Sequence, residues 1–190
     1  MTRRALAIAT IAVLAVVVAG AVLFYLFGPE HRRVQTASQA PVVGKAQVGS
    51  PAPNFEVATT NGLFDLSKAD KPVFLEVFAT WCPHCQREAA VIDRVYQRYH
   101  RSVDFIGVSG SAYAMDGTSA SSENDVLAWI RRFHVAYPVA YDPLLNVANL
   151  YLQGGFPTIA VIDRGKKLAY LNSGELSYDE LVGAIEKAQR

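Results

Sequence analysis

Both cysteines of this 190-residue chain lie in one pentad, Trp81-Cys82-Pro83-His84-Cys85, directly after an apolar run. Because the chain has no third thiol, a framework of structural disulfides and a closed four-cysteine zinc site are both excluded. An apolar core must hold the fold together, and a 51% hydrophobic composition provides the material for one. The pair is therefore free to react with another molecule, and we expect the disulfide of another protein.

Length and charge narrow the class of protein further. A chain of this length predicts one domain with a short appendage. The formal net charge is +1, and the basic and acidic residues are mixed along the chain without a basic stripe. We therefore expect no nucleic-acid partner.

Residues 5–27 form an apolar stretch with only Thr10 and Gly20 as breaks. As a helix that rises about 1.5 Å per residue, this stretch would reach roughly 34 Å, which is enough to cross a bilayer core. We predict a transmembrane anchor over residues 1–27. A cleaved signal peptide with Arg3 and Arg4 as its basic start is the alternative, although its apolar region would usually be only about 7 to 15 residues long.

Residues 28–47 mix Pro, Gly, Ser, Ala and Gln without periodicity, which predicts a linker between the membrane and a domain over residues 48–190. A long domain translocates largely regardless of the charge of the preceding loop. The expected location is a single-pass protein of the cell membrane, with its domain extracytoplasmic, in the periplasm or on the outer face. Such a compartment also tolerates a pair of cysteines that cycles through a disulfide.

The rest of the chain alternates between β-rich runs and segments with helical periodicity. This order predicts an α/β sandwich, a central sheet with helices on both faces. The expected elements are a strand at 73–78, a helix from Pro83 to about His100, a strand at 103–108, a long small and polar stretch at 109–121, a helix capped by Ser122 and Asp125, a strand at 139–141, a short helix at 147–152, strands at 158–162 and 167–171 joined by a turn at 164–165, and a helix capped by Ser177 that ends near Ala188.

The spacing of the two cysteines predicts their roles. Pro83 suits the first position of a helix, so Cys82 lies at the helix N-terminus, where the helix dipole and free N–H groups favour a thiolate. Cys82 is the predicted attacking sulfur, exposed at the helix start, and Cys85 one turn deeper is the resolving sulfur. His84 adds positive potential that favours an oxidising pair, unless it is only an exposed residue without redox effect. Half of a zinc knuckle is the alternative for the motif itself.

These residues resemble a known family. Phe78-Ala79-Thr80-Trp81-Cys82-Pro83-His84-Cys85, followed by Phe156-Pro157-Thr158, resembles the thioredoxin superfamily. The segment Val48-Gly49-Ser50-Pro51-Ala52-Pro53-Asn54-Phe55 resembles the entry motif of its TlpA-like branch of redoxin domains, membrane-tethered thiol-disulfide oxidoreductases that include reductases of cytochrome c maturation. The resemblance covers about residues 48–189.

The resemblance implies a thioredoxin-like three-layer sandwich with a central mixed sheet. It implies an enzyme with no cofactor other than its redox-active disulfide, no metal, and protein thiols or disulfides as substrates, apocytochrome c among them. A membrane redox partner would recycle the pair. By position, Pro157 is the cis-proline that faces Cys82, with Phe156 and Thr158 beside it in the substrate groove. The residues that tune the pair are Trp81, Pro83 and His84.

Two glutamates are candidates for handling the proton of the resolving cysteine. Glu88, three residues after Cys85, matches an acidic position of the TlpA-like pattern, with an ordinary surface glutamate as the alternative. Glu76 falls where thioredoxin has a buried acidic residue that accepts a proton from the deeper cysteine. Burial would raise the pKa of Glu76 toward the range of a general base, and a polar residue at a strand end is its alternative.

The sequence leaves the direction of electron flow open. The branch implies a reductase, whereas Cys-Pro-His-Cys matches the strongly oxidising DsbA-type motif. A copper-binding chaperone of the same fold is an alternative function, with Cys82 and Cys85 as soft ligands and His100 or His134 as the third. A non-catalytic interaction domain is a further alternative, and it would show an ordinary thiol pKa at Cys82.

Overall fold

The computed structural model describes Val18 and residues 44–190. The predicted anchor and most of the predicted linker lie outside the described residues. Within the part of the chain that is described, no helix combines the length and the apolar character needed to cross a membrane.

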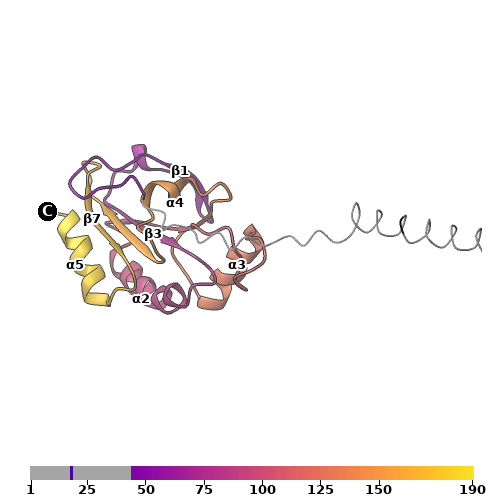
Figure 1. Ribbon diagram of the computed structural model, residues 1–190. Coiled ribbons are helices and arrows are strands. Elements are labelled where there is room, and N and C mark those ends of the chain that lie inside the picture. The colour runs from indigo at the N-terminus through magenta and orange to yellow at the C-terminus, as the bar shows by residue number, and fades with distance from the viewer. Residues whose placement is uncertain (1–17, 19–43) are drawn as a thin grey trace, which may run out of the picture. The chain divides into compact units, whose positions relative to one another are not determined.

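A seven-stranded mixed sheet runs through the centre of the domain in the order β2-β1-β5-β4-β3-β6-β7 (Figure 1). Strands β3, β4 and β5 are parallel, whereas β6 runs antiparallel to β3, and β1 antiparallel to β5. The mixed sheet expected from the resemblance is confirmed. Its strands are β1 (Glu56–Thr59), β2 (Gly62–Asp65), β3 (Val73–Phe78), β4 (Asp104–Ser109), β5 (Val139–Tyr141), β6 (Thr158–Ile162) and β7 (Leu168–Ser173).

Helices cover both faces of the sheet, as predicted. Helices α2, α3 and α5 lie together on one side and α4 lies on the other (Figure 1). The three-layer sandwich is therefore present. The helices are α2 (Pro83–Tyr99), α3 (Glu123–Phe133), α4 (Asn146–Tyr151) and α5 (Tyr178–Ala188), and a 3-10 turn, η1 (Leu66–Lys68), follows β2.

Strand β3 supplies side chains to both layers, and all six of its residues are buried. Because side chains alternate along a strand, Phe74 and Phe78 pack under α2 and α5, whereas Val73, Leu75 and Val77 pack under α4. Burial of each large apolar side chain contributes roughly 1.5–3 kcal/mol. The same alternation directs Glu76 toward the layer that contains α2.

The helix boundaries agree with the local capping signals of the sequence. Pro83 is the first residue of α2, with Cys82 at the N-cap. The Ser122 side chain accepts the Asp125 N–H at the start of α3. A complete capping box between Ser177 and Glu180 opens α5.

The segment before β3 contains two strands that its sequence pattern does not predict. The hairpin of β1 and β2 extends the sheet beyond β5, with Thr59 paired to Gly62 across the turn. Both strands are only four residues long and half-exposed, so their hydrophobic pattern is weak. Residues 44–47, assigned to the linker from composition, also pack on the domain: Ala46 is buried, and its N–H donates to the Leu150 carbonyl.

Candidate active site

The two cysteines lie where β3 gives way to α2. Both thiols are free. The Cys82 sulfur is 3.4 Å from the Phe156 carbonyl oxygen, and Cys82 is 4% exposed against 0% for Cys85. The predicted order of accessibility holds, but the expectation of an exposed Cys82 is wrong, because the segment that contains Phe156 covers it.

The two thiols differ in acidity. The pKa of Cys82 is lowered to about 6, mainly by a hydrogen bond that the Cys85 thiol donates. Burial opposes this shift, whereas the backbone N–H groups of Cys85 and His84 lower the pKa further. The charge of His84 contributes least. Burial raises the pKa of Cys85 far above its ordinary value, and its hydrogen bond to Cys82 and the nearby Glu76 act in the same direction. Near neutral pH, Cys82 is therefore a thiolate and Cys85 a thiol.

The loop opposite Cys82 has the backbone geometry that the resemblance implied. The Phe156–Pro157 peptide bond is cis. The Thr158 hydroxyl donates to the Gly155 carbonyl at 2.8 Å and accepts the Gln153 N–H at 3.1 Å. These bonds fix the chain on both sides of Pro157 and direct the Phe156 carbonyl toward Cys82.

Trp81 and Thr80 connect the cysteine loop to neighbouring segments. The Trp81 indole N–H donates to the Ser111 hydroxyl at 2.8 Å, and its ring packs edge-on against Phe156 with centroids 5.9 Å apart. The Thr80 hydroxyl donates to Asp125 at 2.8 Å, and the same carboxylate accepts the Met115 N–H at 2.9 Å. The small and polar stretch after β4 is thus fastened to the site, which composition did not reveal.

Glu76 lies within β3 and not at its end, and it is 0% exposed. The Tyr137 hydroxyl donates to its Oε2 at 2.8 Å. Gly107 is the residue opposite it in β4 and leaves room for this pair, because a Cβ there would lie 3.0 Å from the Tyr137 ring. Burial, followed by the charge of Glu88, raises the pKa of Glu76 well above its usual range. Tyr137 was not predicted.

Glu88 is fully buried, so the alternative of a surface glutamate is wrong. It lies on the inner face of α2, one turn after Cys85. The Leu176 N–H donates to its Oε1 at 2.7 Å. Burial nevertheless raises the pKa of Glu88 to about 7. A carboxyl group with this pKa exchanges protons readily at neutral pH.

His84 lies on the rim of the site, with its side chain 58% exposed. Its Nδ1 is 3.0 Å from Glu175 Oε2 and 2.8 Å from Arg87 Nη2. Arg87 also pairs with Glu175. Arg87 could have been found from its spacing three residues after His84 on a helix. Glu175 is 91 residues from His84 and carries no local signal.

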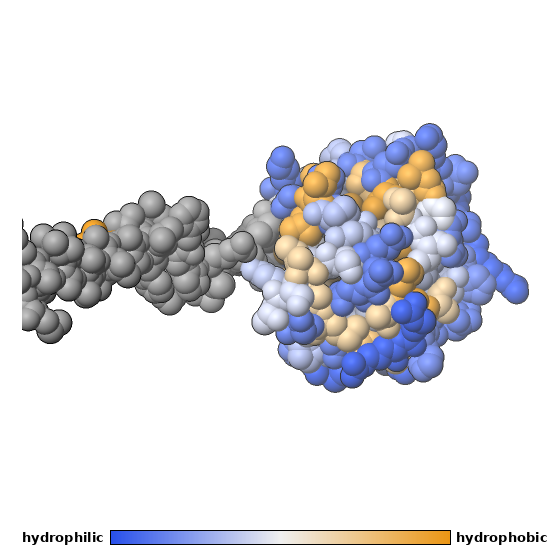
Figure 2. Space-filling model, turned by 90° about the vertical axis from the view of Figure 1, so that its right-hand side faces the viewer, coloured by the Kyte–Doolittle hydropathy of each residue, from blue (hydrophilic) through white to orange (hydrophobic). Residues whose placement is uncertain are grey.

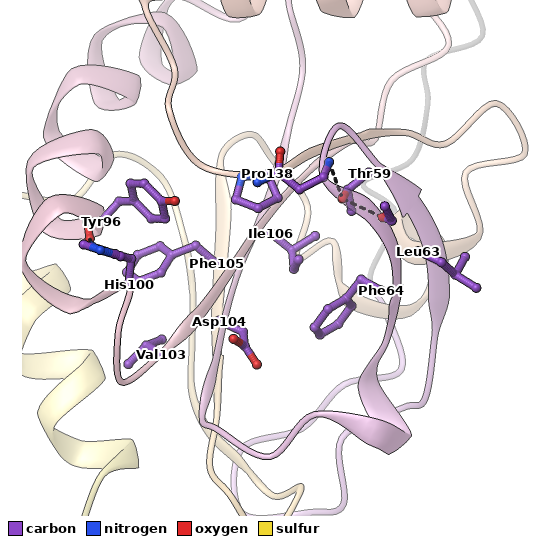
Figure 3. A pocket seen from close by; sticks show the side chains of 12 residues that line it. Thr59, Leu63, Phe64, Tyr96, His100, Val103, Asp104, Phe105, Ile106 and Pro138 are labelled. Atoms are coloured by element: carbon purple, nitrogen blue, oxygen red, sulfur yellow. Dashed lines mark hydrogen bonds between the residues drawn. The ribbon is translucent and has the colours of Figure 1, made fainter.

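The histidines of the copper alternative are distant from the cysteines. His100 follows the last turn of α2. At a rise of about 1.5 Å per residue, it lies about 22 Å along the helix from Cys85. It borders a pocket of about 230 Å³ between α2 and the β1–β2 hairpin, and its Nδ1 lies 3.0 Å from the Tyr96 carbonyl oxygen (Figure 3). His134 follows the far end of α3. Across residues 44–190, no three His, Cys, Asp or Glu side chains form a group suited to a metal.

The surface around the domain is mixed in polarity. Figure 2 shows small groups of apolar side chains (orange) that are separated by polar ones (blue) on the face turned to the viewer. Few large apolar side chains of the domain are exposed, and they are far apart in sequence. They are Val48, Leu63, Tyr113 and Leu144.

A buried dithiol of unequal acidity at a helix N-terminus, a cis-proline loop beside the more acidic sulfur and two buried carboxyl groups define a class. These are the parts of an enzyme that exchanges its own dithiol with the disulfides of other molecules. The comparisons with known proteins agree with this class.

The Redoxin family model matches residues 47–185. The chain therefore belongs to the redoxin family, and it is a thiol-disulfide oxidoreductase. The thiol-disulfide oxidoreductase ResA of Bacillus cereus is 31% identical over 147 residues, which are 75% of this chain and 79% of that protein.

Solved structures share the fold. DsbF of MTB, in mixed oxidized and reduced forms, is 26% identical with a TM-score of 0.59, and the match covers 73% of this chain and 99% of that one. A DsbF homologue from Corynebacterium diphtheriae has a TM-score of 0.61 at 21% identity, covering 72% of this chain and 85% of that one.

Proposed function

We propose that this enzyme is held in the cell membrane by residues 1–27 and reduces disulfides of protein substrates on the extracytoplasmic side. The observation that carries the proposal is the pair of unlike thiols: the pKa of Cys82 is lowered to about 6, and that of Cys85 is raised by burial. The apolar stretch at 5–27 supports the anchor. The likeness to the TlpA-like branch supports the reducing direction.

The first step is attack by the Cys82 thiolate on one sulfur of a substrate disulfide. A bond forms between Cys82 and that sulfur, the substrate disulfide breaks, and its other sulfur leaves as a thiolate that takes a proton from solvent. The Phe156–Pro157 segment offers backbone beside the Cys82 sulfur, with Phe156 and Thr158 as part of the groove. The Trp81 ring packs edge-on against Phe156 and borders this groove on one side.

The second step resolves the mixed disulfide. Cys85 gives its proton to a buried carboxylate and attacks the Cys82 sulfur, which releases the second substrate sulfur as a thiolate and leaves a Cys82–Cys85 disulfide. Glu88 is suited to hold this proton at neutral pH because its pKa is about 7. Glu76, hydrogen-bonded to Tyr137, lies on the same side of the sheet and influences Cys85 directly.

Two electrons pass to the substrate in each cycle, so the resulting disulfide must be reduced again. We propose a membrane dithiol partner for this step and apocytochrome c among the substrates, both on the likeness to the TlpA-like branch. The cysteine pair itself is the redox group in this scheme, and no further cofactor takes part.

The test is insulin reduction by the purified full chain in detergent with dithiothreitol as electron donor. Cys82→Ser is expected to abolish catalysed reduction, because no other thiolate is available to attack. Cys85→Ser is the matched control: it retains Cys82 and is expected to accumulate the mixed disulfide, visible by mass. Reduction at the wild-type rate by Cys82→Ser would refute the proposed function.

A further inference from the structure

The segment between β7 and α5 is fastened to the active site at two points. The Gly174 N–H donates to the Pro157 carbonyl oxygen at 2.8 Å. Two residues later, the Leu176 N–H donates to Glu88 at 2.7 Å. Glu175 lies between these two bonds, so its position is set by the same residues that border Cys82 and Cys85.

Glu175 is directed at two basic side chains, His84 and Arg87, on the first turns of α2. Its Oε2 is 2.7 Å from Arg87 Nη2 and 3.0 Å from His84 Nδ1, and its Oε1 is 3.3 Å from Arg87 Nε. The two-pronged contact with Arg87 is the geometry in which guanidinium and carboxylate pair best. The Glu175 side chain is 33% exposed and that of Arg87 is 55% exposed.

Arg87 and His84 both interact electrostatically with Cys82. His84 lowers the pKa of Cys82, and the Cys82 thiolate in turn contributes to the raised pKa of Arg87. Glu175 also adds to the raised pKa of Glu88. The charged groups that face this part of the site are thus His84, Arg87, Glu175 and Glu88.

We propose that Glu175 is a redox-tuning residue that cancels the positive charge of Arg87 beside Cys82, and thereby holds the Cys82–Cys85 pair more reducing than its Cys-Pro-His-Cys motif alone would give. A dithiol becomes a stronger oxidant when its thiolate form is stabilised. With Glu175 in place, the rim around Cys82 carries little net charge and gives the thiolate little extra stability. The inference rests on the proposed function and assigns a cause to its reducing direction.

The test measures the equilibrium of the full chain with reduced and oxidised glutathione at pH 8, above the range in which histidines usually titrate. Glu175→Gln removes one negative charge and retains the shape of the side chain. The equilibrium is expected to move about threefold to tenfold toward the dithiol, which is a potential about 14 to 30 mV less negative. The change is modest because the charges are partly exposed to solvent.

Arg87→Gln separates a charge effect from a structural one. It is expected to move the equilibrium in the opposite direction, and the double variant with Glu175→Gln is expected to return near the wild-type value. Loss of a merely structural contact would move both single variants in the same direction. Glu56→Gln, a matched charge change at an exposed site in β1, is expected to leave the equilibrium unchanged.

The outcomes that overturn the inference are an equilibrium of Glu175→Gln within about 1.5-fold of wild type, or shifts of the same sign in both single variants. These results are distinct from failure of the proposed function, in which Cys82→Ser would still reduce insulin. Opposite shifts that cancel in the double variant establish Glu175 as the tuning residue.

Discussion

The two faces of β3 carry different kinds of residue, although both are fully buried. On the face toward α4, Val73, Leu75 and Val77 belong to an apolar cluster that includes residues of α4. On the face toward α2, Glu76 lies between Phe74 and Phe78, close to the buried thiols. The difference shows that one face contributes apolar packing, whereas the other also holds a buried carboxyl group, whose charged form is disfavoured there.

The same contrast extends to the helices. On α2, the inner face carries Glu88 among apolar residues, with one backbone N–H as its hydrogen-bond donor. The buried residues of α4 are Val147, Ala148 and Tyr151, whose hydroxyl donates to the Pro53 carbonyl. Titratable carboxyl groups and thiols are therefore concentrated where α2 meets β3.

The largest expected effect is a loss of stability on substitution of Leu75, next to Glu76 but on the opposite face of β3. Leu75→Ala is expected to lower the free energy of unfolding by about 2–5 kcal/mol, because it opens a cavity in the layer under α4. The pKa of Cys82 should stay the same. Denaturant unfolding and the pH dependence of thiol alkylation check the two statements.

Glu76→Gln is the matched variant on the other face. Because the amide oxygen of this variant can still accept the Tyr137 hydroxyl and the amide places no charge in the buried layer, the free energy of unfolding should change by no more than about 1 kcal/mol. Decay of the mixed disulfide should slow by about 100-fold. Unchanged decay together with a large loss of stability would remove the distinction between the faces.

An effect of about 3 kcal/mol is expected in the pH dependence of stability. The pKa of Glu88 is about 7 in the folded chain against an ordinary value of 4.5, so the folded state binds the proton more tightly than the unfolded state. The free energy of unfolding therefore falls as pH rises from about 4.5 to above 7. Glu88→Gln carries no such proton, and its advantage over wild type should grow by about 3 kcal/mol across this range.

Urea unfolding of both proteins from pH 4.5 to 8 measures this difference. Glu123→Gln, an exposed position at the start of α3, is the control and should run parallel to wild type. If the Glu88→Gln curve also runs parallel to wild type, the carboxyl group does not retain its proton in the folded state.

The smallest expected effect concerns the two sulfurs themselves. With a pKa of about 6, Cys82 should react with iodoacetamide in a rate profile that rises through pH 6 and then levels. At pH 7 the larger thiolate fraction of Cys82, offset by the lower intrinsic nucleophilicity of a more acidic thiol, should give a rate about twofold to threefold above that of an ordinary thiol, whose pKa is near 8.5. Cys85→Ala should move the midpoint upward, and Cys85→Ser should move it less, because a hydroxyl group still donates to Cys82. An unchanged midpoint in Cys85→Ala would exclude this hydrogen bond as the main cause.

Much of the fold was predictable because its elements carry strong periodic signals. The run Val73–Phe78, the apolar spacing of α2 and the capping box at Ser177 each identified an element without tertiary information. The β1–β2 hairpin was missed, since its short strands are half-exposed and are held by pairing with β5, which no local pattern reveals.

The candidate site was predictable where its residues are adjacent in sequence or match a motif. The cysteines, His84 and Pro157 belong to this group. Tyr137 and Glu175 do not, because they meet Glu76 and His84 across 61 and 91 residues, and only the folded topology brings them together. The burial of Cys82 was also missed, because it depends on the approach of the Phe156 segment.

Gly107 has no Cβ atom, and this leaves room for the buried pair of Glu76 and Tyr137. Its position in β4 faces Glu76, and an added Cβ would lie 3.0 Å from a Tyr137 ring carbon and 3.6 Å from Glu76 Oε2. A larger residue there would crowd the hydrogen bond between Tyr137 and Glu76. The buried carboxyl group of Glu76 and the space beside it at Gly107 therefore go together, and a design that places such a pair on another strand needs a glycine on the adjacent strand.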